Sequence, residues 1–316
     1  MELTYADVVA AREVVYRHLP PTPMWNYPVL DAAAGATVFV KHENVQPVGA
    51  FKARGGLNLL AGLSAAERER GTITYSTGNH AQSLAYASAV YGAPCTVVMP
   101  AAASPAKAAA VGSWGAEVVL TGDSLEGAQR YAEERAAETG ARLVSPGDTP
   151  ELVAGVGTLY LEILEAQPDL DAIIVPVGSG TGAASATIVA AEMAPKTRII
   201  GVQSESSRAG HDSWRSGQLE RRPNGTRVDG LATGRGYDFP QQILRGRLAD
   251  FLLVTDDQIG AAQRLLATAA HTLAEGAGAA GLAAVLTYPG QFRNKRLAVV
   301  CTGGNADAAE LKALGS

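Results

Sequence analysis

Short runs of β-branched and other apolar residues alternate with alanine-rich amphipathic runs along most of this chain. The first pattern predicts strands and the second predicts helices. Several of the strands are apolar almost throughout, which is typical of parallel sheets covered by helices on both faces. We therefore expect an α/β fold of mostly parallel sheets, with strands at Ala36–Lys41, Thr72–Ser76, Cys95–Met99, Glu117–Leu120, Ala172–Val177, Arg198–Gln203, Asp250–Val254 and Arg296–Cys301.

Composition and charge indicate what kind of molecule this protein binds. The chain has 316 residues, 47% of them hydrophobic, which is enough for a substantial core in one or two tightly associated domains. The formal net charge of -5 and the lack of a large Lys/Arg cluster argue against nucleic acid. A small molecule is the expected partner.

Three features bear on localisation. The start of the chain, Met1-Glu2-Leu3-Thr4, does not lead from basic residues into an apolar run, so we expect no secretory signal. No apolar run is long enough to span a bilayer, so we expect no membrane partner. Cys95 and Cys301 lie far apart in apolar or glycine-rich surroundings, which favours reduced thiols in a cytoplasmic protein.

The first candidate site is a lone lysine, Lys52, within the segment Pro47–Gly55. A solvated lysine at a helix start is one interpretation. The other is a lysine that forms a Schiff base, because an amine partly desolvated among Gly49, Ala50 and Phe51 loses its proton and attacks an aldehyde.

The second is Ser76-Thr77-Gly78-Asn79-His80-Ala81-Gln82, which follows a strand and precedes an alanine-rich segment. Hydroxyls, an amide and backbone N–H groups at a helix N-terminus form a site for a carboxylate. A polar N-cap with a histidine whose hydrogen bonds are satisfied is the simpler alternative.

The third is the glycine-rich run Pro176–Ala183, placed between an apolar strand and an alanine-rich helix. Its glycines let successive N–H groups face a phosphate, and the helix dipole adds to the attraction. The spacing Gly178-x-Gly180-x-x-Ala183 also satisfies a relaxed dinucleotide pattern, with Gln203 and Glu205 as possible ribose partners. A nicotinamide-dependent oxidoreductase is therefore a competing hypothesis.

The fourth is Cys301-Thr302-Gly303-Gly304-Asn305, a second strand-to-glycine turn near the end of the sequence. A hydroxyl at the carboxyl end of a strand can meet a ring nitrogen in the crevice where open parallel sheets bind ligands. An ordinary tight turn is the alternative.

Together and in this order, the four segments resemble fold-type II pyridoxal-phosphate enzymes of the threonine/serine dehydratase and serine racemase group, over nearly the whole chain. The resemblance implies two open, mostly parallel twisted sheets with flanking helices, as in tryptophan synthase β. It implies pyridoxal 5'-phosphate as cofactor and α,β-elimination from a β-hydroxy amino acid, giving a 2-oxo acid and ammonia. A racemase of the same family is the alternative.

The resemblance assigns roles to residues of this sequence. Lys52 looks like the lysine that holds the cofactor as an imine and removes the α-proton, and Phe51 packs against the ring. Asn79 would hydrogen-bond the phenolic oxygen, and Thr302 would face the pyridine nitrogen. The phosphate would be held by Gly178, Ser179, Gly180 and Thr181.

The substrate carboxylate would be held by Ser76, Thr77 and His80, partly through backbone N–H groups. Thr77 stands where racemases of this group use a serine as acid/base, and its extra methyl stiffens χ1, so we expect weak racemisation. Gln203 stands where many relatives carry a metal-binding glutamate, so we expect no metal site. Ala50 replaces a common serine.

The family architecture implies a large domain from residues 1–67 and 148–316 and a small domain from residues 68–147. It also favours a homodimer. The substrate stays open, because threonine, serine, 3-hydroxyaspartate and β-aryl serines would share the same core. A stretch from Arg208 to Tyr237 is loop-like, and we expect it to border the site or a subunit contact.

Overall fold

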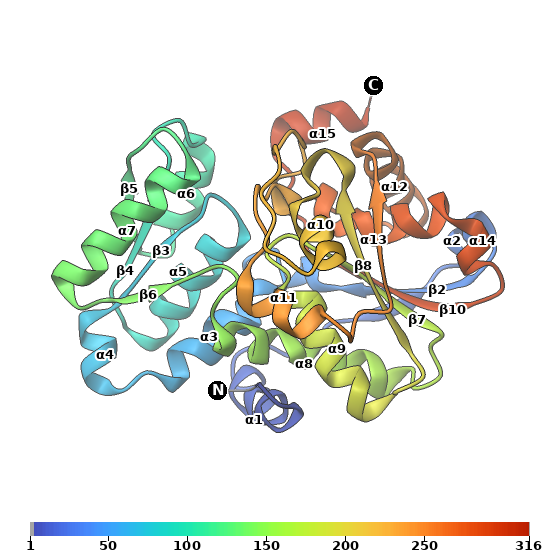
Figure 1. The fold of residues 1–316 in the computed structure, drawn as a ribbon, viewed down its shortest axis with the longest axis horizontal. Coiled ribbons are helices and arrows are strands. Elements are labelled where there is room, and N and C mark those ends of the chain that lie inside the picture. Colours follow the sequence, from blue (N-terminus) through green and yellow to red (C-terminus); the bar gives the residue numbers. More distant parts are fainter. Residues whose placement is uncertain (1–2, 316) are drawn as a thin grey trace.

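The computed structural model describes residues 3–315 and contains two sheets, each with its own covering helices (Figure 1). The larger sheet has six strands in the order β1-β2-β10-β7-β8-β9, which span Met24–Asn26, Thr37–His42, Arg296–Cys301, Ala172–Pro176, Arg198–Ser204 and Asp250–Val254. The smaller has four in the order β5-β4-β3-β6, which span Glu117–Leu120, Cys95–Met99, Thr72–Tyr75 and Arg142–Val144. The predicted fold class is confirmed.

All paired strands are parallel except β1, which runs antiparallel to β2 at one edge of the larger sheet. The eight predicted strands are all present, with ends that differ by a residue at most. Two further strands, β1 and β6, were not predicted, because they have three residues each and are too short to show a periodic pattern.

The apolar character of the central strands follows from burial on both faces. In β7, Ile174 packs into one core with helices α12 (Asp256–Ala269) and α13 (Gly276–Thr287). Its neighbours Ile173 and Val175 pack into a second core with α8 (Pro150–Ala166) and α9 (Thr181–Met193). Successive side chains of a strand point to opposite faces, so a strand covered on both sides has no polar alternation.

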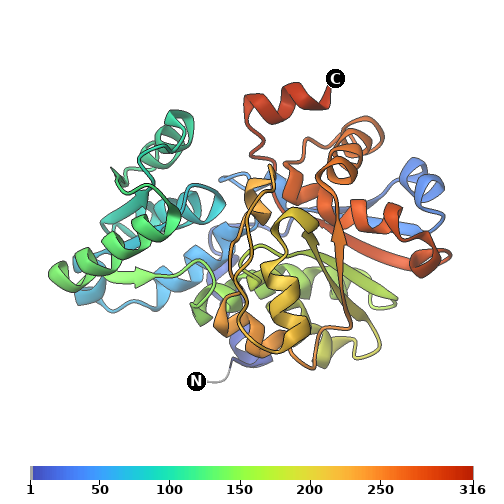
Figure 2. The ribbon, with the colours of Figure 1, turned by 45° about the horizontal axis from the view of Figure 1, so that its top comes forward.

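The smaller sheet is covered by α7 (Leu125–Thr139) on one face and by α5 (Asn79–Tyr91) and α6 (Pro105–Gly112) on the other. Both views show this sheet and its helices beside the rest of the chain (Figures 1 and 2). Helix α3 (Lys52–Gly62) packs against both α5 and α8. A Cβ on Gly55 or Gly56 would lie 2.8 Å from Leu152 O or 2.7 Å from Ser83 O, so glycine allows this close packing.

The remaining elements are α1 (Tyr5–Val15), α2 (Pro28–Ala34), α4 (Ala65–Arg70), α10 (Ala209–Ser216), α11 (Asp238–Leu244), α14 (Pro289–Phe292), α15 (Ala308–Leu314) and three 3₁₀ turns, η1 (Glu43–Val45), η2 (Glu205–Ser207) and η3 (Asp229–Leu231). The prediction of a loop from Arg208 to Tyr237 is wrong in part, because α10 and η3 lie within it. Within the described range, no helix is long and apolar enough to cross a bilayer.

Candidate active site

A cavity of about 190 Å³ is lined by residues from both halves of the molecule. Strands β3, β7 and β10 each end in a loop at its wall, as expected for ligand sites at the carboxyl ends of parallel strands. The four segments singled out from the sequence meet here, through Phe51, Lys52, Ser76, Thr77, Asn79, His80, Gly178, Ser179, Gly180, Thr181 and Thr302.

Lys52 is the first residue of α3, and its side chain is partly exposed to the cavity but lies deep within the protein. Its Nζ lies 2.8 Å from Thr181 Oγ1 and 3.1 Å from Ser179 Oγ. No carboxylate among residues 3–315 forms an ion pair with it, and burial lowers its pKa to about 7. An amine with this pKa is substantially neutral at physiological pH, which is the form that attacks carbonyls and accepts protons.

The lysine segment is held against the turn after β10 by backbone hydrogen bonds. Phe51 N donates to Thr302 O at 3.0 Å, and Ala50 forms a bridge with Gly303. On the other side of α3, the Ser83 hydroxyl donates to the Lys52 carbonyl at 2.5 Å. Lys52 and Thr302 are therefore placed in fixed relation to each other and to α5.

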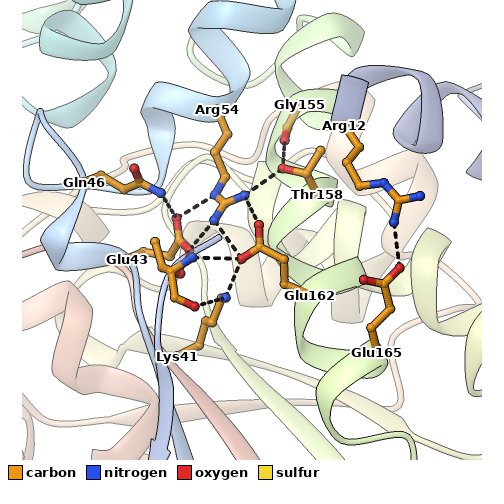
Figure 3. A network of polar contacts seen from close by, with 10 residues as sticks. Arg12, Lys41, Glu43, Gln46, Arg54, Gly155, Thr158, Glu162 and Glu165 are labelled. Carbon is orange, nitrogen blue, oxygen red and sulfur yellow. Dashed lines mark hydrogen bonds and ion pairs between the residues drawn. The ribbon is translucent and has the colours of Figure 1, made fainter. Parts of the chain in front are cut away.

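A buried ion network around Arg54 holds the first turn of α3, the turn that carries Lys52 (Figure 3). The Arg54 guanidinium donates to Glu43 Oε2 at 2.8 Å and to Glu162 Oε1 at 2.6 Å, and Lys41 Nζ contacts Glu162 Oε2 at 2.5 Å. Burial alone would lower the pKa of Arg54, but the two carboxylates outweigh it and raise that pKa. Two acids and two bases balance, so the network joins β2, η1, α3 and α8 without an unpaired charge.

The loop after β3 leads into α5 at Asn79. Ser76, Thr77 and Gly78 are partly exposed at the cavity, whereas His80 is buried. The Thr74 hydroxyl donates to Val144 O at 2.7 Å, so its oxygen accepts from His80 Nε2 at 2.9 Å. Burial lowers the pKa of His80 to about 3, so its ring is neutral at physiological pH. A substrate carboxylate would therefore contact the backbone N–H of His80 and not its ring.

The turn after β7 forms a cradle at the N-terminus of α9. A Cβ on Gly178 would lie 2.3 Å from Gly230 O, and Gly180 has a positive φ of 95° with Pro240 2.8 Å from a notional Cβ. Only glycine fits at both places, which leaves backbone N–H groups open to the cavity at the positive end of a 13-residue helix. With Lys52 beside it, this cradle fits a phosphate attached to an aldehyde-bearing ring.

The dinucleotide hypothesis fails at its predicted ribose partners, because neither Gln203 nor Glu205 lines the cavity. Gln203 is fully buried, and its Oε1 accepts from His211 N at 3.0 Å while its Nε2 lies 3.3 Å from Thr233 Oγ1. Both polar atoms of the Gln203 side chain therefore contact other protein groups and do not face the cavity. Across residues 3–315, no group of three or more His, Cys, Asp or Glu side chains is placed to hold a metal ion.

Glu275 lines the cavity just before α13 and was not among the residues predicted from the sequence. Its Oε1 accepts from Asn79 Nδ2 at 2.6 Å, and burial raises its pKa to about 7. An acidic residue inside the otherwise small and apolar run Leu273–Gly278 was the available signal. The cavity also contains an ion pair that no pattern predicted, between Lys107 of α6 and Asp229 of η3.

Comparison with known proteins agrees with these features. A family model described as "Pyridoxal-phosphate dependent enzyme" matches residues 15–303. The L-threonine ammonia-lyase of Thermotoga maritima is 35% identical over 306 residues, covering 96% of this chain and 76% of that protein. The L-threo-3-hydroxyaspartate ammonia-lyase of Saccharomyces cerevisiae is 33% identical over 305 residues, covering 96% and 94%.

Among solved structures, serine racemase from Dictyostelium discoideum superposes with a TM-score of 0.91 at 30% identity, covering 96% of this chain and 99% of that one. Relatives of both the ammonia-lyase and the racemase type are thus close to this chain. The chain belongs to the pyridoxal-phosphate-dependent enzyme family, as a fold-type II member of its threonine/serine dehydratase and serine racemase group whose cofactor is pyridoxal 5'-phosphate.

Proposed function

We propose that this enzyme removes water from a β-hydroxy-α-amino acid such as threonine, serine or a β-substituted serine, giving a 2-oxo acid and ammonia. The observation that carries the proposal is Lys52, a partly buried amine with a pKa of about 7 beside a glycine cradle for phosphate. Relatives named as ammonia-lyases for threonine and for threo-3-hydroxyaspartate support this reaction class.

Pyridoxal phosphate, when bound, supplies an aldehyde for the amino groups of Lys52 and substrate and a ring that withdraws electrons from the α-carbon. Phe51 would pack against that ring, and the N–H groups of Gly178, Ser179, Gly180 and Thr181 would hold the phosphate. Asn79 would donate a hydrogen bond to the phenolic oxygen. Thr302 would offer a neutral hydroxyl to the pyridine nitrogen, and such a hydroxyl does not hold that nitrogen protonated.

Substrate binding falls to the loop after β3. Ser76, Thr77 and the backbone N–H of His80 bind the carboxylate and so orient the Cα–H bond toward Lys52. The neutral Lys52 Nζ accepts the α-proton, because burial without a carboxylate partner disfavours its charged form. The β-hydroxyl takes up a proton and leaves as water, and the enamine that remains is then hydrolysed with one water to the 2-oxo acid and ammonia.

The wider organisation belongs to the same proposal. A large domain of residues 1–67 and 148–316 and a small domain of residues 68–147 would close on the cofactor from two sides, and the four-stranded sheet falls inside the second range. We place the enzyme in the cytoplasm as a homodimer. Two free, buried cysteines, Cys95 and Cys301, are consistent with a reducing compartment.

The decisive experiment is an absorbance spectrum of the purified protein before and after borohydride, followed by 2-oxo acid assays with L-threonine, L-serine, threo-3-hydroxyaspartate and threo-β-phenylserine. We expect a band at about 410–420 nm, typical of a lysine-bound pyridoxal cofactor, that reduction traps on Lys52. Lys52→Ala should lower kcat/KM at least about 1,000-fold, because it removes both attachment and base. A wild-type protein that takes up the cofactor but yields no 2-oxo acid from any of the four overturns the proposal.

Racemisation is the second candidate, favoured by Thr77, a hydroxyl-bearing residue that is partly exposed and lines the cavity. The added methyl of threonine restricts χ1, so we expect racemisation to be slower than elimination. Thr77→Ser should raise the ratio of racemisation to elimination, measured by chiral analysis of residual substrate beside 2-oxo acid release. Equal rates in the unmodified enzyme would contradict this order.

A further inference from the structure

A chain of side-chain amides crosses the cavity wall and joins four segments that are distant in sequence. Asn305 Nδ2 donates to Val48 O at 2.8 Å and to Asn79 Oδ1 at 2.8 Å. Asn79 Nδ2 in turn donates to Glu275 Oε1 at 2.6 Å. The lysine segment, the turn after β10, the start of α5 and the start of α13 are linked in this way.

The direction of this chain is fixed at its first member. The Val48 carbonyl can only accept a hydrogen bond, so the Asn305 atom that contacts it is the nitrogen. That nitrogen has two N–H groups, and the second one faces Asn79, whose contacting atom is therefore the oxygen. The Asn79 nitrogen then lies on the other side, where one N–H is used by Glu275 and one is left for the cavity.

The lysine segment is shaped around Asn305. Gly49 has a positive φ of 66°, and a Cβ there would lie 2.5 Å from Asn305 Oδ1. Gly304 N donates to Gly49 O at 2.9 Å, so the two turns are also held together through their backbones. Glycine at residue 49 leaves the room that the Asn305 side chain occupies.

We infer that Asn305 is a positioning residue that sets the direction of the Asn79 amide, so that Asn79 offers an N–H and not a carbonyl to the cofactor's phenolic oxygen. The inference rests on the role proposed above for Asn79. Asn305 itself does not touch the reacting atoms. It acts by fixing which end of the Asn79 side-chain amide faces the cavity.

Glu275 cannot set this direction alone. Burial raises its pKa to about 7, against the hydrogen bond from Asn79, which lowers that pKa; Glu310 and Asp229 add to the rise and Lys107 opposes it. Below pH 7 the carboxyl is therefore mostly protonated and can also donate. A protonated Glu275 could accept from the Asn79 nitrogen or donate to the Asn79 oxygen, whereas the carboxylate can only accept from the nitrogen. The need for Asn305 is therefore greatest below pH 7.

The test uses apo and holo forms of the unmodified protein, Asn305→Asp, Asn305→Ala, Asn79→Ala and the double variant Asn79→Ala/Asn305→Asp. Three quantities are measured: the dissociation constant of pyridoxal phosphate, the absorbance spectrum of the bound cofactor between pH 6 and 9, and the melting temperature of the apo form. The matched control is Asn58→Asp, which removes one amide donor to a backbone carbonyl, Glu151 O, away from the cavity.

We expect Asn305→Asp to weaken cofactor binding about tenfold, the effect of one lost hydrogen bond, and to shift the absorbance of the bound cofactor. In the Asn79→Ala background the same substitution should have no further effect on affinity, because the two residues act as one unit. Asn305→Ala should alter the spectrum more at pH 6 than at pH 9. Asn58→Asp should lower the apo melting temperature while leaving affinity and spectrum unchanged.

Equal loss of affinity with and without Asn79 would overturn the inference, because Asn305 would then be only a brace between turns. So would an Asn305→Asp protein, or an Asn305→Ala protein if the first does not fold, with unmodified affinity and spectrum. An unmodified protein that binds no pyridoxal phosphate would be a different failure, since it would remove the proposed function itself.

Discussion

Lys52 and Arg54 lie two residues apart in the first turn of α3, and both are removed from bulk water, but their surroundings differ in kind. Arg54 is enclosed by the carboxylates of Glu43 and Glu162, and its pKa rises. Lys52 faces hydroxyls and a carbonyl, and its pKa falls to about 7. Burial alone thus does not decide the charge of a buried cation; the presence of a carboxylate partner does.

The difference separates two tasks within one helical turn. The paired guanidinium stabilises the arrangement of β2, α3 and α8, and its charge is fixed at every physiological pH. The unpaired amine destabilises the fold in its charged form and is available for proton transfer in its neutral form. The ion pairs of Arg54 hold the same helical turn that carries Lys52, so they help to fix the position from which the amine reaches the cavity.

Among the substitutions that test this contrast between Arg54 and Lys52, the largest effect on stability is expected at Arg54. Arg54→Ala should lower the free energy of unfolding by about 3–5 kcal/mol, because it leaves Glu43 and Glu162 buried without a guanidinium. The measurement is urea unfolding of the cofactor-free protein. A loss below about 1 kcal/mol would mean that the network relaxes or admits water, and the contrast with Lys52 would lose its basis.

Lys52 should show its unpaired state in the pH dependence of stability. Its folded pKa of about 7 lies below the unfolded value of about 10.4, so the unfolded chain binds more protons between those limits. The amine's contribution to stability is present above the unfolded pKa and is lost as pH falls toward 7, with a slope of at most about 1.4 kcal/mol per pH unit.

This slope is obtained from urea unfolding of cofactor-free protein between pH 7.5 and 9, as the difference between the unmodified chain and Lys52→Ala. Subtraction removes the titration of other groups common to both proteins. A difference that stays constant over this range would show that Lys52 is charged in the folded apo protein.

The smallest change in the free energy of unfolding is expected when the removed charge belongs to an ion pair that is not buried. Arg142 and Glu151 form an ion pair at 3.0 Å, and each side chain is 41% exposed. Arg142→Ala should change the free energy of unfolding by less than about 1 kcal/mol, because water screens the pair. Together with Arg54→Ala, under identical urea titrations, it isolates the effect of burial on a paired arginine. A loss as large as that of Arg54→Ala would contradict this interpretation.

The strands and the four site segments could be predicted because their signals are local. A β-branched run such as Cys95–Met99 and a glycine turn such as Gly178–Gly180 depend on residues next to one another. Glu275 and the Lys107–Asp229 pair could not be found in this way, because their importance depends on contacts between separate elements. The roles assigned from the resemblance stay predictions until the variants are measured.

The stretch after β8 shows a second limit. Between Arg208 and Tyr237 the glycines, serines and arginines suggest a loop, yet α10 forms within it. Helix α10 buries Ala209, Gly210 and Ser213 and contacts α11 and β9. Tertiary packing thus outweighs the weak helix propensity of this stretch.

The position of β10 between β2 and β7 has a consequence for how the protein is made. A ribosome produces the lysine segment early and the Thr302 segment late, yet Phe51 N and Thr302 O are hydrogen-bonded in the finished fold. The pairing of β10 with β2 and β7 therefore cannot form before residues 296–301 have been synthesised. The same holds for the hydrogen bond that joins the lysine segment to Thr302, so the cofactor cavity is completed only by the last part of the sheet to be made.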